Sequence, residues 1–594
     1  MPGESHGDAP AAVPLQVAVQ SAALSCVNGH QPEDQPKTLK CGECAKEATI
    51  VCGGCWTHGY CARDHQLKGW EKHRPKCRPW RVGASSELGR FMVATRDVAA
   101  GELLMKDSPL LMGPKMVTEP ICLACYRPVD GEYTCNGCGF PLCSADCEGT
   151  VDHEPECKAI RDSGVPVKVS VFGEENSMYE CITPLRVLNL RNESPTLWNK
   201  IMTLESNCDM RDGTEVAAIT EQTVVDIIHN RLELEEEYET EIIEKVLGIL
   251  DTNAFEIRLP DSSILGVYSS ASLLEHDCVP NTHRTFDADL NLVVRAAIPI
   301  KRGDHLTSCY TESIATTNYR QEHLRSSKYF ICGCKRCTDP TELKAFTSAL
   351  RCTDCTEKAE AEAKKKKAEV QGRGRGVVRG GARRGGVMNR INQIQTSQAA
   401  GSSQQGSSSS TQSTASGDND GTGPWIVQQD PLSLSSSWKC LNCGNPCTDD
   451  YPERITSVAQ EEAEELEESP TVDQCEAFIE KWISTFHPDH AIFVNIKYVL
   501  VHLYGSEEGY DIEELTPIQL MKKEELCTQV LRVADIIQPG ISRLRGSILY
   551  EQYQALYYKA KAMFLVGAAT SEQTRRIAMD ALTALKECAR VLSK

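Results

Sequence analysis

The chain has 594 residues, 41% of them hydrophobic, which is enough for several domains with their own cores. A formal net charge of −20 argues against a protein that binds nucleic acid over its whole surface. We expect neither a signal peptide nor a membrane span, so the 29 cysteines predict metal sites rather than disulfides. We therefore expect a nuclear and cytoplasmic location without membrane contact.

The first predicted module covers residues 38–80 and follows residues 1–37, which are expected to be disordered. Two Cys-x2-Cys knuckles precede a Cys-x3-His pair and a His-x3-Cys pair, and together they supply eight ligands for two tetrahedral zinc ions. These ligands are Cys41, Cys44, Cys52, Cys55, Cys61, His65, His73 and Cys77. Their order predicts interleaving, with Cys41, Cys44, Cys61 and His65 on one ion and the other four on the second. The segments YCARDHQ (residues 60–66) and WEKHRPKC (residues 70–77) resemble a MYND zinc finger, an interaction module.

A second cluster over residues 119–160 repeats this template about eighty residues later. Its predicted ligands are Cys122, Cys125, Cys135, Cys138, Cys143, Cys147, His153 and Cys157. The interval between Cys147 and His153 is shorter than its counterpart in the first cluster. We still expect a MYND-like finger that holds two zinc ions.

Strands and helices are predicted around and after this second finger. Residues 88–102, within a segment at 81–118, alternate apolar residues around an Ala-Gly turn and predict a β-hairpin. Residues 161–250 have apolar positions at spacings of three and four, which predict helices. A second hairpin is predicted from strands at 253–257 and 264–268, and it leads into a polar bend at residues 270–281.

The bend and a later cysteine motif indicate a further zinc site. Within residues 326–350, Cys332, Cys334 and Cys337 need a fourth ligand, and Cys278 in the bend is the obvious candidate. The alternative is that Cys278 is a small buried core residue. The order of the bend, the strand that ends at Tyr310 and the Cys-x-Cys-x2-Cys motif resembles the second half of a SET domain, with its core at residues 251–325. A SET domain split by a finger is the SMYD family arrangement, and the additional amino-terminal finger resembles its arthropod-type branch.

The resemblance implies a protein-lysine N-methyltransferase that uses S-adenosylmethionine (SAM). Its substrates would be histone or non-histone proteins with exposed lysines, and its role would lie in transcriptional or chromatin regulation. Tyr310 matches the family's catalytic-site tyrosine, and Tyr329 or Phe330 would line the lysine channel. The residues implied in cofactor binding are Leu88, Gly89, Arg90, Asn253, Glu275, His276 and Phe330.

Three residues of this pocket depart from the family pattern. Phe91 stands where the family has a second glycine, and Glu275 and Asp277 stand where it has Asn and Ser. An ionised glutamate accepts hydrogen bonds but cannot donate them. An alternative hypothesis is therefore a catalytically weak or inactive scaffold, whose MYND fingers recruit proline-rich or corepressor-type protein partners.

A four-cysteine zinc ribbon is predicted over residues 351–447, which brings the expected zinc count to about six. Its ligands are Cys352, Cys355, Cys440 and Cys443, with Cys447 as an alternative. The insert at residues 356–437 is expected to be disordered. Residues 364–390 hold ten Lys and Arg against one Glu, a net charge of +9, so the rest of the chain carries −20 − 9 = −29. This insert is either a tolerated loop or an Arg/Gly-rich segment that contacts RNA or the acidic face of its own protein.

The carboxy-terminal residues 452–594 are predicted to form a helical domain resembling tetratricopeptide repeats. Helices are expected over residues 492–503, 522–536, 550–565 and 574–592. A helix start at Pro488 explains His487 and His490 better than zinc binding does. The predicted fold class is a multidomain α+β protein, in which a β-rich SET domain is combined with two fingers, a post-SET zinc site and a helical carboxy-terminal region.

Overall fold

The computed structural model describes residues 39–52, 58–373, 423–433, 436–447, 450–565, 567 and 569–593. Its α-helices are α2 Arg63–Cys77, α3 Ala145–Glu148, α4 Glu154–Ser163, α5 Ile182–Glu193, α6 Pro195–Ile201, α7 Cys208–Arg211, α8 Glu215–Asp226, α9 Thr240–Asn253, α10 Thr317–Lys328, α11 Lys335–Thr338, α12 Thr353–Arg373, α13 Tyr451–Glu467, α14 Val472–Trp482, α15 Ala491–Leu503, α16 Pro517–Ile537, α17 Arg543–Leu565 and α18 Ser571–Leu592. Short turns of 3₁₀-helix (η1 Ser177–Tyr179, η3 Ala271–Leu273) and π-helix (η2 Ile227–Arg231) complete this set. The predicted disorder of residues 1–37 lies outside the described residues.

The strands form several small sheets rather than one large sheet. They are β1 Ile50–Val51, β2 Gly59–Tyr60, β3 Trp80–Ser85, β4 Gly89–Ala94, β5 Leu103–Asp107, β6 Pro109–Pro114, β7 Ala254–Arg258, β8 Ser263–Tyr268, β9 Glu275–His276, β10 Thr282–Phe286, β11 Leu292–Ala296, β12 Thr307–Ser308, β13 Leu350–Arg351, β14 Trp425–Gln428 and β15 Trp438–Cys440. Two three-stranded antiparallel sheets have the orders β10-β11-β5 and β6-β8-β7. The bend between β8 and β10 contributes β9, which pairs in parallel with β12.

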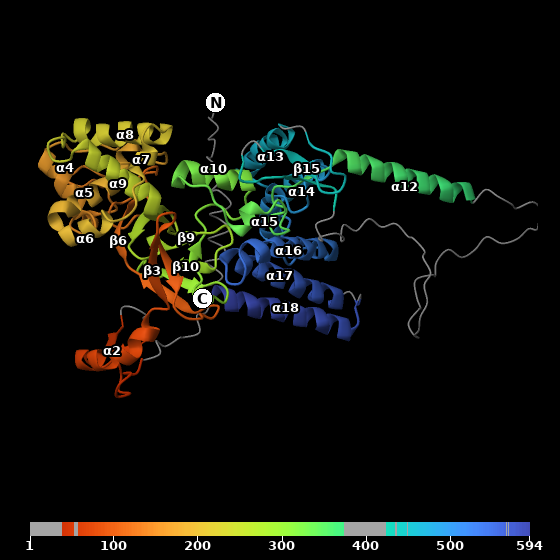
Figure 1. The fold of residues 1–594 in the computed structure, drawn as a ribbon, viewed down its shortest axis with the longest axis horizontal. Coiled ribbons are helices and arrows are strands. Elements are labelled where there is room, and N and C mark those ends of the chain that lie inside the picture. The colour runs from red at the N-terminus through yellow and green to blue at the C-terminus, as the bar shows by residue number, and fades with distance from the viewer. Residues whose placement is uncertain are drawn as a thin grey trace, which may run out of the picture.

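Figure 1 shows how these parts lie relative to one another. Helices α4 to α9 gather on one side of the strands, and helices α13 to α18 form a helical region on the other side. The first finger, with α2, stands apart beneath the strands. The mixed sheet and helix architecture confirms the predicted α+β multidomain class.

The buried residues explain this arrangement. One core joins the strands of the central part, the second finger and α5 to α9, and it includes Met92, Cys138 and Leu250. A separate core joins the ribbon cysteines to the carboxy-terminal helices. The first finger has only a small cluster of its own around Cys41 and Tyr60. Its stability therefore depends on its metal ligands more than on packing.

The hairpin predicted for residues 88–102 is wrong in its partner. Strand β4 pairs with the preceding β3, whereas β5 pairs with β11 in another sheet. The connecting segment turns away because Val98 exchanges two backbone hydrogen bonds with Ile300, at 2.8 and 3.0 Å. The Glu102 carboxylate stabilises this turn by accepting from the Ala99 N–H at 3.1 Å.

The second hairpin has the predicted turn, since the Leu259 N–H donates to the Ser262 carbonyl at 2.8 Å between β7 and β8. Asn253, expected in the first strand, is instead the last residue of α9. Its side-chain amide donates to the Ile249 carbonyl at 2.8 Å, which extends the helix to this residue.

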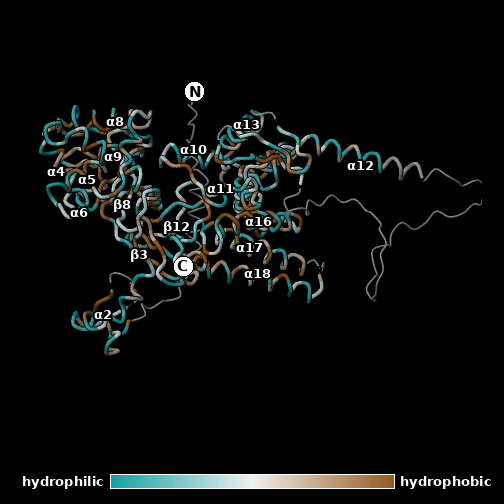
Figure 2. Tube along the Cα trace, in the orientation of Figure 1, coloured by the Kyte–Doolittle hydropathy of each residue, from teal (hydrophilic) through white to brown (hydrophobic). Residues whose placement is uncertain are grey.

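The insert expected to be disordered at residues 356–437 is partly ordered. Helix α12 extends to Arg373, and β14 pairs with β13 and β15. Alanine, glutamate and lysine, which dominate the sequence of α12, have high helix propensity, and this explains the helix. Figure 2 shows α12 projecting from the body as a mostly hydrophilic rod, and the predicted disorder of residues 374–422 lies outside the described residues.

Helices α16 to α18 begin earlier than predicted, and α15, predicted over residues 492–503, begins one residue earlier. Helix α15 begins at Ala491 rather than at Pro488, because His490 is its N-cap and accepts from the Ile492 N–H at 3.4 Å. Helices α16 to α18 follow one another as long helices (Figure 1). Among the described residues, every helix is too short or too polar to span a membrane.

Candidate functional site

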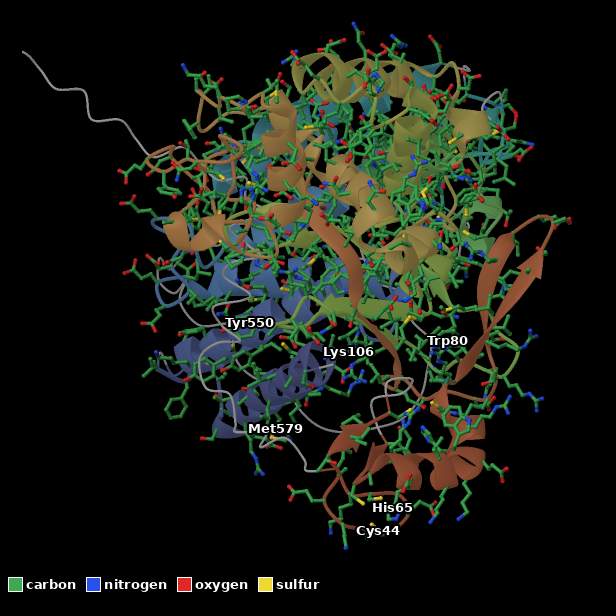
Figure 3. The ribbon with its side chains drawn as sticks, turned by 90° about the vertical axis from the view of Figure 1, so that its left-hand side faces the viewer. Cys44, His65, Trp80, Lys106, Tyr550 and Met579 are labelled. Carbon is green, nitrogen blue, oxygen red and sulfur yellow. The ribbon has the colours of Figure 1, made fainter. Side chains whose placement is uncertain are left out.

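The first finger brings four of its predicted ligands together. Cys41, Cys44, Cys61 and His65 have ligand atoms that all lie within 4.8 Å of one another. The Sγ atoms of Cys44 and Cys61 are 3.4 Å apart, and Cys61 Sγ lies 3.2 Å from His65 Nδ1. Figure 3 shows Cys44 and His65 close together in this finger, at the end away from the rest of the molecule.

The other predicted set of the first finger is described in part. Cys52, before α2, and Cys77, the last residue of α2, have Sγ atoms 3.4 Å apart. His73 is buried in the same finger and stacks on His58 with ring centroids 4.1 Å apart. Cys55 lies outside the described residues, so its place in this set stays a prediction.

The second finger divides its eight predicted ligands into two groups. One contains Cys122, Cys125, Cys143 and Cys147, and the other contains Cys135, Cys138, His153 and Cys157. In the second group the Cys135 and Cys157 sulfurs are 3.6 Å apart, and Cys138 Sγ lies 3.5 Å from His153 Nε2. The shorter interval before His153 therefore does not prevent the ligands from meeting.

A buried network that sequence reasoning missed holds His153. Its Nδ1 lies 3.0 Å from Glu156 Oε1, and Glu156 in turn receives two hydrogen bonds from Arg186, at 2.8 and 2.6 Å. All three side chains are buried. A carboxylate on the second ring nitrogen fixes the orientation of a metal-bound imidazole. Glu156 follows His153 by three residues on a short helix, and this spacing is the sequence signal that could have revealed it.

The post-SET cysteines meet Cys278. The sulfurs of Cys278, Cys332, Cys334 and Cys337 form one group, with Cys278 at 3.4 Å from Cys337 and 4.0 Å from Cys332. A disulfide would need about 2.05 Å. Thiolates about 2.3 Å from one tetrahedral zinc ion lie about 3.8 Å apart, so these four cysteines fit zinc.

The ribbon cysteines meet across the long insert. Cys352 lies 3.8 Å from Cys443, and Cys355 lies 3.8 Å from Cys440, measured between sulfurs. Cys447, the predicted alternative, is outside this group of four. The antiparallel pairing of β13, β14 and β15 brings the two knuckles together although about 85 residues separate them.

The polar bend is fixed to the strand that precedes Tyr310. Asn281 donates from its side chain to the His305 carbonyl at 2.7 Å and accepts from the Thr307 N–H at 2.9 Å. Its own N–H donates to Thr307 Oγ1 at 3.0 Å. These contacts and the β9–β12 pairing hold the bend and the strand rigidly side by side.

Tyr310 lies against the bend. Its N–H donates to His276 Nδ1 at 3.0 Å, and its hydroxyl donates to the Leu274 carbonyl. The other nitrogen of His276 lies 3.2 Å from Cys278 Sγ, so one imidazole connects Tyr310 to the cysteine group. Burial lowers the pKa of His276 to about 4, which keeps the ring neutral.

Phe330 and Tyr329, the two candidates for the lysine channel, occupy different positions. The Phe330 ring packs 5.8 Å from the His276 ring and belongs to the same buried cluster as Tyr310. Tyr329 caps α10 with a φ of 60°, a left-handed conformation that turns the backbone just before Phe330. Phe330 therefore lies beside His276 and Tyr310, and the channel roles of Phe330 and Tyr329 stay predictions.

The residues that depart from the family pattern contact one another. Glu275 Oε2 lies 2.5 Å from His305 Nδ1. Phe91 stacks on the other side of this pair, with its ring 4.5 Å from the His305 ring and an interplanar angle of 17°. Residues more than 180 positions apart in the sequence thus form one Phe91–His305–Glu275 cluster.

The predicted cofactor residues outside the bend have mixed positions. Gly89 has a φ of +63° and open space where a side chain would begin, so its backbone is accessible. Leu88 is exposed, and Arg90 donates to the Thr203 carbonyl at 2.6 Å. The side-chain amide of Asn253 donates to two backbone carbonyls, that of Glu205 at 2.7 Å and that of Ile249. Asn253 therefore positions α9 rather than offering a donor to a ligand.

Two further residues of this site were missed by sequence reasoning. The Asp107 carboxylate accepts from the N–H groups of Ser270 and Ala271, at 2.6 and 2.9 Å, and so anchors the start of the bend. Arg284 donates to Ser308 Oγ at 3.2 Å, and its charge acts on Tyr310. Asp107 is far from the bend in sequence, and Arg284 lies on β10 just after the bend, where no motif marks it.

Comparison with known proteins agrees with this geometry. The family model of the MYND finger matches residues 40–77, and that of the SET domain matches residues 89–311. The SET domain-containing protein SmydA-8, isoform B, of Drosophila melanogaster is 30% identical over 301 residues, which are 47% of this chain and 62% of that protein. The chain thus carries a MYND finger and a SET domain, and it is similar to SMYD proteins. The human histone-lysine N-methyltransferase SMYD3 is 28% identical to this chain over 276 residues, 43% of the chain and 60% of SMYD3.

The match to these relatives is partial. The chain spans about 60% of the length of the SmydA-8 isoforms and of human SMYD3. Among solved structures, the SET domain of LSMT bound to lysine and AdoHcy is 13% identical, covers 48% of this chain and 62% of that chain, and has a TM-score of 0.24. That likeness carries no weight in the assignment.

Proposed function

We propose that this chain is a SAM-dependent protein-lysine N-methyltransferase. The observation that carries the proposal is the position of Tyr310, held by His276 on its backbone and by the Leu274 carbonyl on its hydroxyl. The SET family match includes this tyrosine and the whole bend. The relatives named as lysine methyltransferases support the same reaction.

The chain's own residues meet the needs of methyl transfer to an amine. SAM, when bound, supplies a methyl group on a sulfonium centre, and the protein must present a neutral lysine amine in line with it. Burial and then the negative charge of Glu275 raise the pKa of Tyr310, so its hydroxyl stays protonated. That hydroxyl and the Leu274 carbonyl can orient the amine. The positive charge of Arg284 beside Tyr310 disfavours a protonated amine.

The cofactor side of the site offers an open backbone and a carboxylate. The accessible backbone of Gly89 suits a flat ligand that passes along β4. His305 holds Glu275 through Oε2, so Oε1 is the oxygen suited to the cationic amino group of SAM. The zinc sites maintain the shape around this pocket.

The direct test measures SAM binding by calorimetry and transfer of labelled methyl groups to histones and lysate proteins. We expect Tyr310→Phe to lower transfer by about 10²–10³-fold, in the range of losing one polarising donor, with SAM affinity within threefold of wild type. Tyr557→Phe, which changes an exposed tyrosine on α17, serves as the matched control. Absence of both SAM binding and transfer in the wild-type chain would refute the proposal.

A zinc-finger scaffold that recruits corepressor-type proteins is the second candidate function. The separate small core of the first finger supports it, because that finger stands apart from the strands (Figure 1). We expect this activity in the nucleus and the cytoplasm. A pull-down with a Cys44→Ser variant tests it: lost partners with unchanged methyl transfer support recruitment by the finger, and unchanged partners contradict it.

A further inference from the structure

A cavity of about 360 Å³ lies away from the Tyr310 site, where four parts of the chain meet. Its walls come from the loop that begins α10, from the ribbon through Trp438, from α13 and from the start of α15. Tyr310, His276 and Phe330 are absent from its described lining. The volume is at the lower end of the range for ligand sites in proteins, so it suits one or two side chains.

The charge of this cavity is one-sided. Its lining includes four carboxylates, and no Lys or Arg occurs among the described lining residues. These carboxylates belong to Glu312, Glu453, Glu464 and Glu467. Glu312 precedes α10 whereas the other three lie on α13, so the fold brings like charges together from separate elements. Burial and then the charges of Glu312 and Glu464 raise the pKa of Glu467, as expected for carboxylates that face one another without a cation.

The described neighbours do not neutralise these four groups by ion pairing. Glu453 accepts from Trp438 Nε1 at 2.9 Å, and Glu464 accepts from Gln460 Nε2 at 2.9 Å, which are both neutral donors. Within the described residues, the ion pairs of α13 go to Glu462, which is outside the cavity lining. A cation in the cavity would supply the missing charge.

A buried histidine in the lining points to the rest of the ligand. His490 is fully buried, and its Nε2 has no hydrogen-bond partner among the described residues. Its Nδ1 accepts from the Ile492 N–H, so Nε2 carries the hydrogen of the neutral ring and is a donor without an acceptor. Burial lowers the pKa of His490 to about 3, which keeps the ring in this neutral form. A carbonyl oxygen is the natural acceptor for this group.

The aromatic wall matches the same kind of ligand. Tyr319 is about half exposed at 51% and lines the cavity beside Glu312 and Glu464. Flat guanidinium groups and ammonium groups are attracted to the face of such a ring. Carboxylates, an aromatic face and an unpaired N–H donor together describe a site for a cationic side chain attached to a carbonyl-bearing backbone.

We propose that this cavity binds a basic peptide of a partner protein, with an arginine or lysine side chain held among Glu312, Glu464 and Glu467 and a peptide carbonyl on His490. The site is separate from methyl transfer and does not depend on SAM. It would anchor an Arg- or Lys-rich protein while the fingers and the SET domain remain available. Charge complementarity makes the binding weaken as salt rises.

Fluorescence polarisation with a labelled peptide of alternating glycine and arginine tests the proposal on the full chain. We expect saturable binding, and at least tenfold weaker binding for a peptide with glutamine at each arginine. The double variant Glu464→Gln, Glu467→Gln should also weaken binding at least tenfold. The matched control Glu461→Gln, Glu465→Gln removes the same charge from α13 outside the cavity lining and should change affinity less than twofold.

Equal weakening by the two double variants would mean that a diffuse acidic surface attracts the peptide, and it would overturn the proposal. A final variant replaces arginines of the chain's own basic segment by glutamine. The positions are Arg375, Arg379, Arg383, Arg384 and Arg390. If the peptide binds only to this variant, the chain's own segment is the occupant, and a partner protein is excluded.

Discussion

Replacing His305 by alanine tests whether Glu275 and His305 act as one unit in cofactor binding. Glu275 Oε2 and His305 Nδ1 are 2.5 Å apart, and the side chains are 39% exposed for His305 and 15% exposed for Glu275. Exposed ion pairs contribute below about 1 kcal/mol, whereas hydrogen bonds to charged groups contribute about 1.5–3 kcal/mol. For this half-buried pair we expect a coupling of about 1.5 kcal/mol, which corresponds to about tenfold in SAM affinity.

The assay is a double-mutant cycle with SAM affinity measured by calorimetry for His305→Ala, Glu275→Ala and the double variant. Each single change should weaken SAM binding about tenfold, because each leaves the other side chain misplaced, and the double variant should be little worse than either. The control Arg302→Gln alters an exposed side chain on the same turn and should leave affinity unchanged. Additive losses would refute the reasoning, because they would show that the two side chains contribute independently.

Two further predictions concern buried ion networks. Glu342 forms ion pairs with Arg320 at 3.0 Å and with Arg336 at 3.1 Å, and all three side chains are buried. Because Glu342→Gln leaves the two buried arginines without this carboxylate, it should lower the free energy of unfolding by about 3 kcal/mol, measured by chemical denaturation. These two arginines lower the pKa of Glu342 to about 2 despite its burial. The loss of stability in Glu342→Gln should therefore be constant above pH 5 and shrink only as pH falls below about 4.5. Glu156→Gln should weaken zinc binding in the second finger about 10–100-fold, measured by competition with a chelator, because it releases the His153 imidazole.

Each of these predictions has a control, on the helix of Arg320 for Glu342 and on the helix of Glu156 for the zinc site. Glu322→Gln changes an exposed partner on α10 and should alter the free energy of unfolding by less than about 0.5 kcal/mol. Glu154→Gln changes an exposed residue at the start of α4 and should leave zinc affinity within twofold. If the loss of unfolding free energy in Glu342→Gln grew above pH 5, the Glu342 network would not act as described. An unchanged zinc affinity in Glu156→Gln would contradict the role of the His153 network.

Local chemistry explains what the sequence could predict. Two cysteines separated by two residues bring their sulfur atoms to one metal ion, so the spacing predicted groups such as Cys352 and Cys355 with Cys440 and Cys443. The Pro260-Asp261 turn likewise predicted the β7–β8 hairpin. In both cases the information lies within a few residues of the feature.

Pairing between distant strands explains what could not be predicted from the sequence. The partner of β4 depended on whether β3 or β5 lay beside it, and both have suitable patterns. The contact between Glu275 and His305 exists because β9 and β12 pair in parallel, which places residues thirty positions apart side by side. The family comparison marked Glu275 as a departure, but only the structure shows that His305 and Phe91 accompany it.

The post-SET zinc site and the proposed transfer site form one structural unit, and this separates the two candidate functions. His276 contacts Cys278 through one nitrogen and the Tyr310 backbone through the other, and Phe330 precedes Cys332 by two residues. Loss of this zinc would therefore release both walls of the channel at once. The first finger shares no buried core with these residues, so its metal can be lost without moving Tyr310. The proposed methyl transfer would thus depend on the Cys278 site, whereas the proposed recruitment would depend on the ligands of the first finger, so each proposal can be tested without disturbing the other.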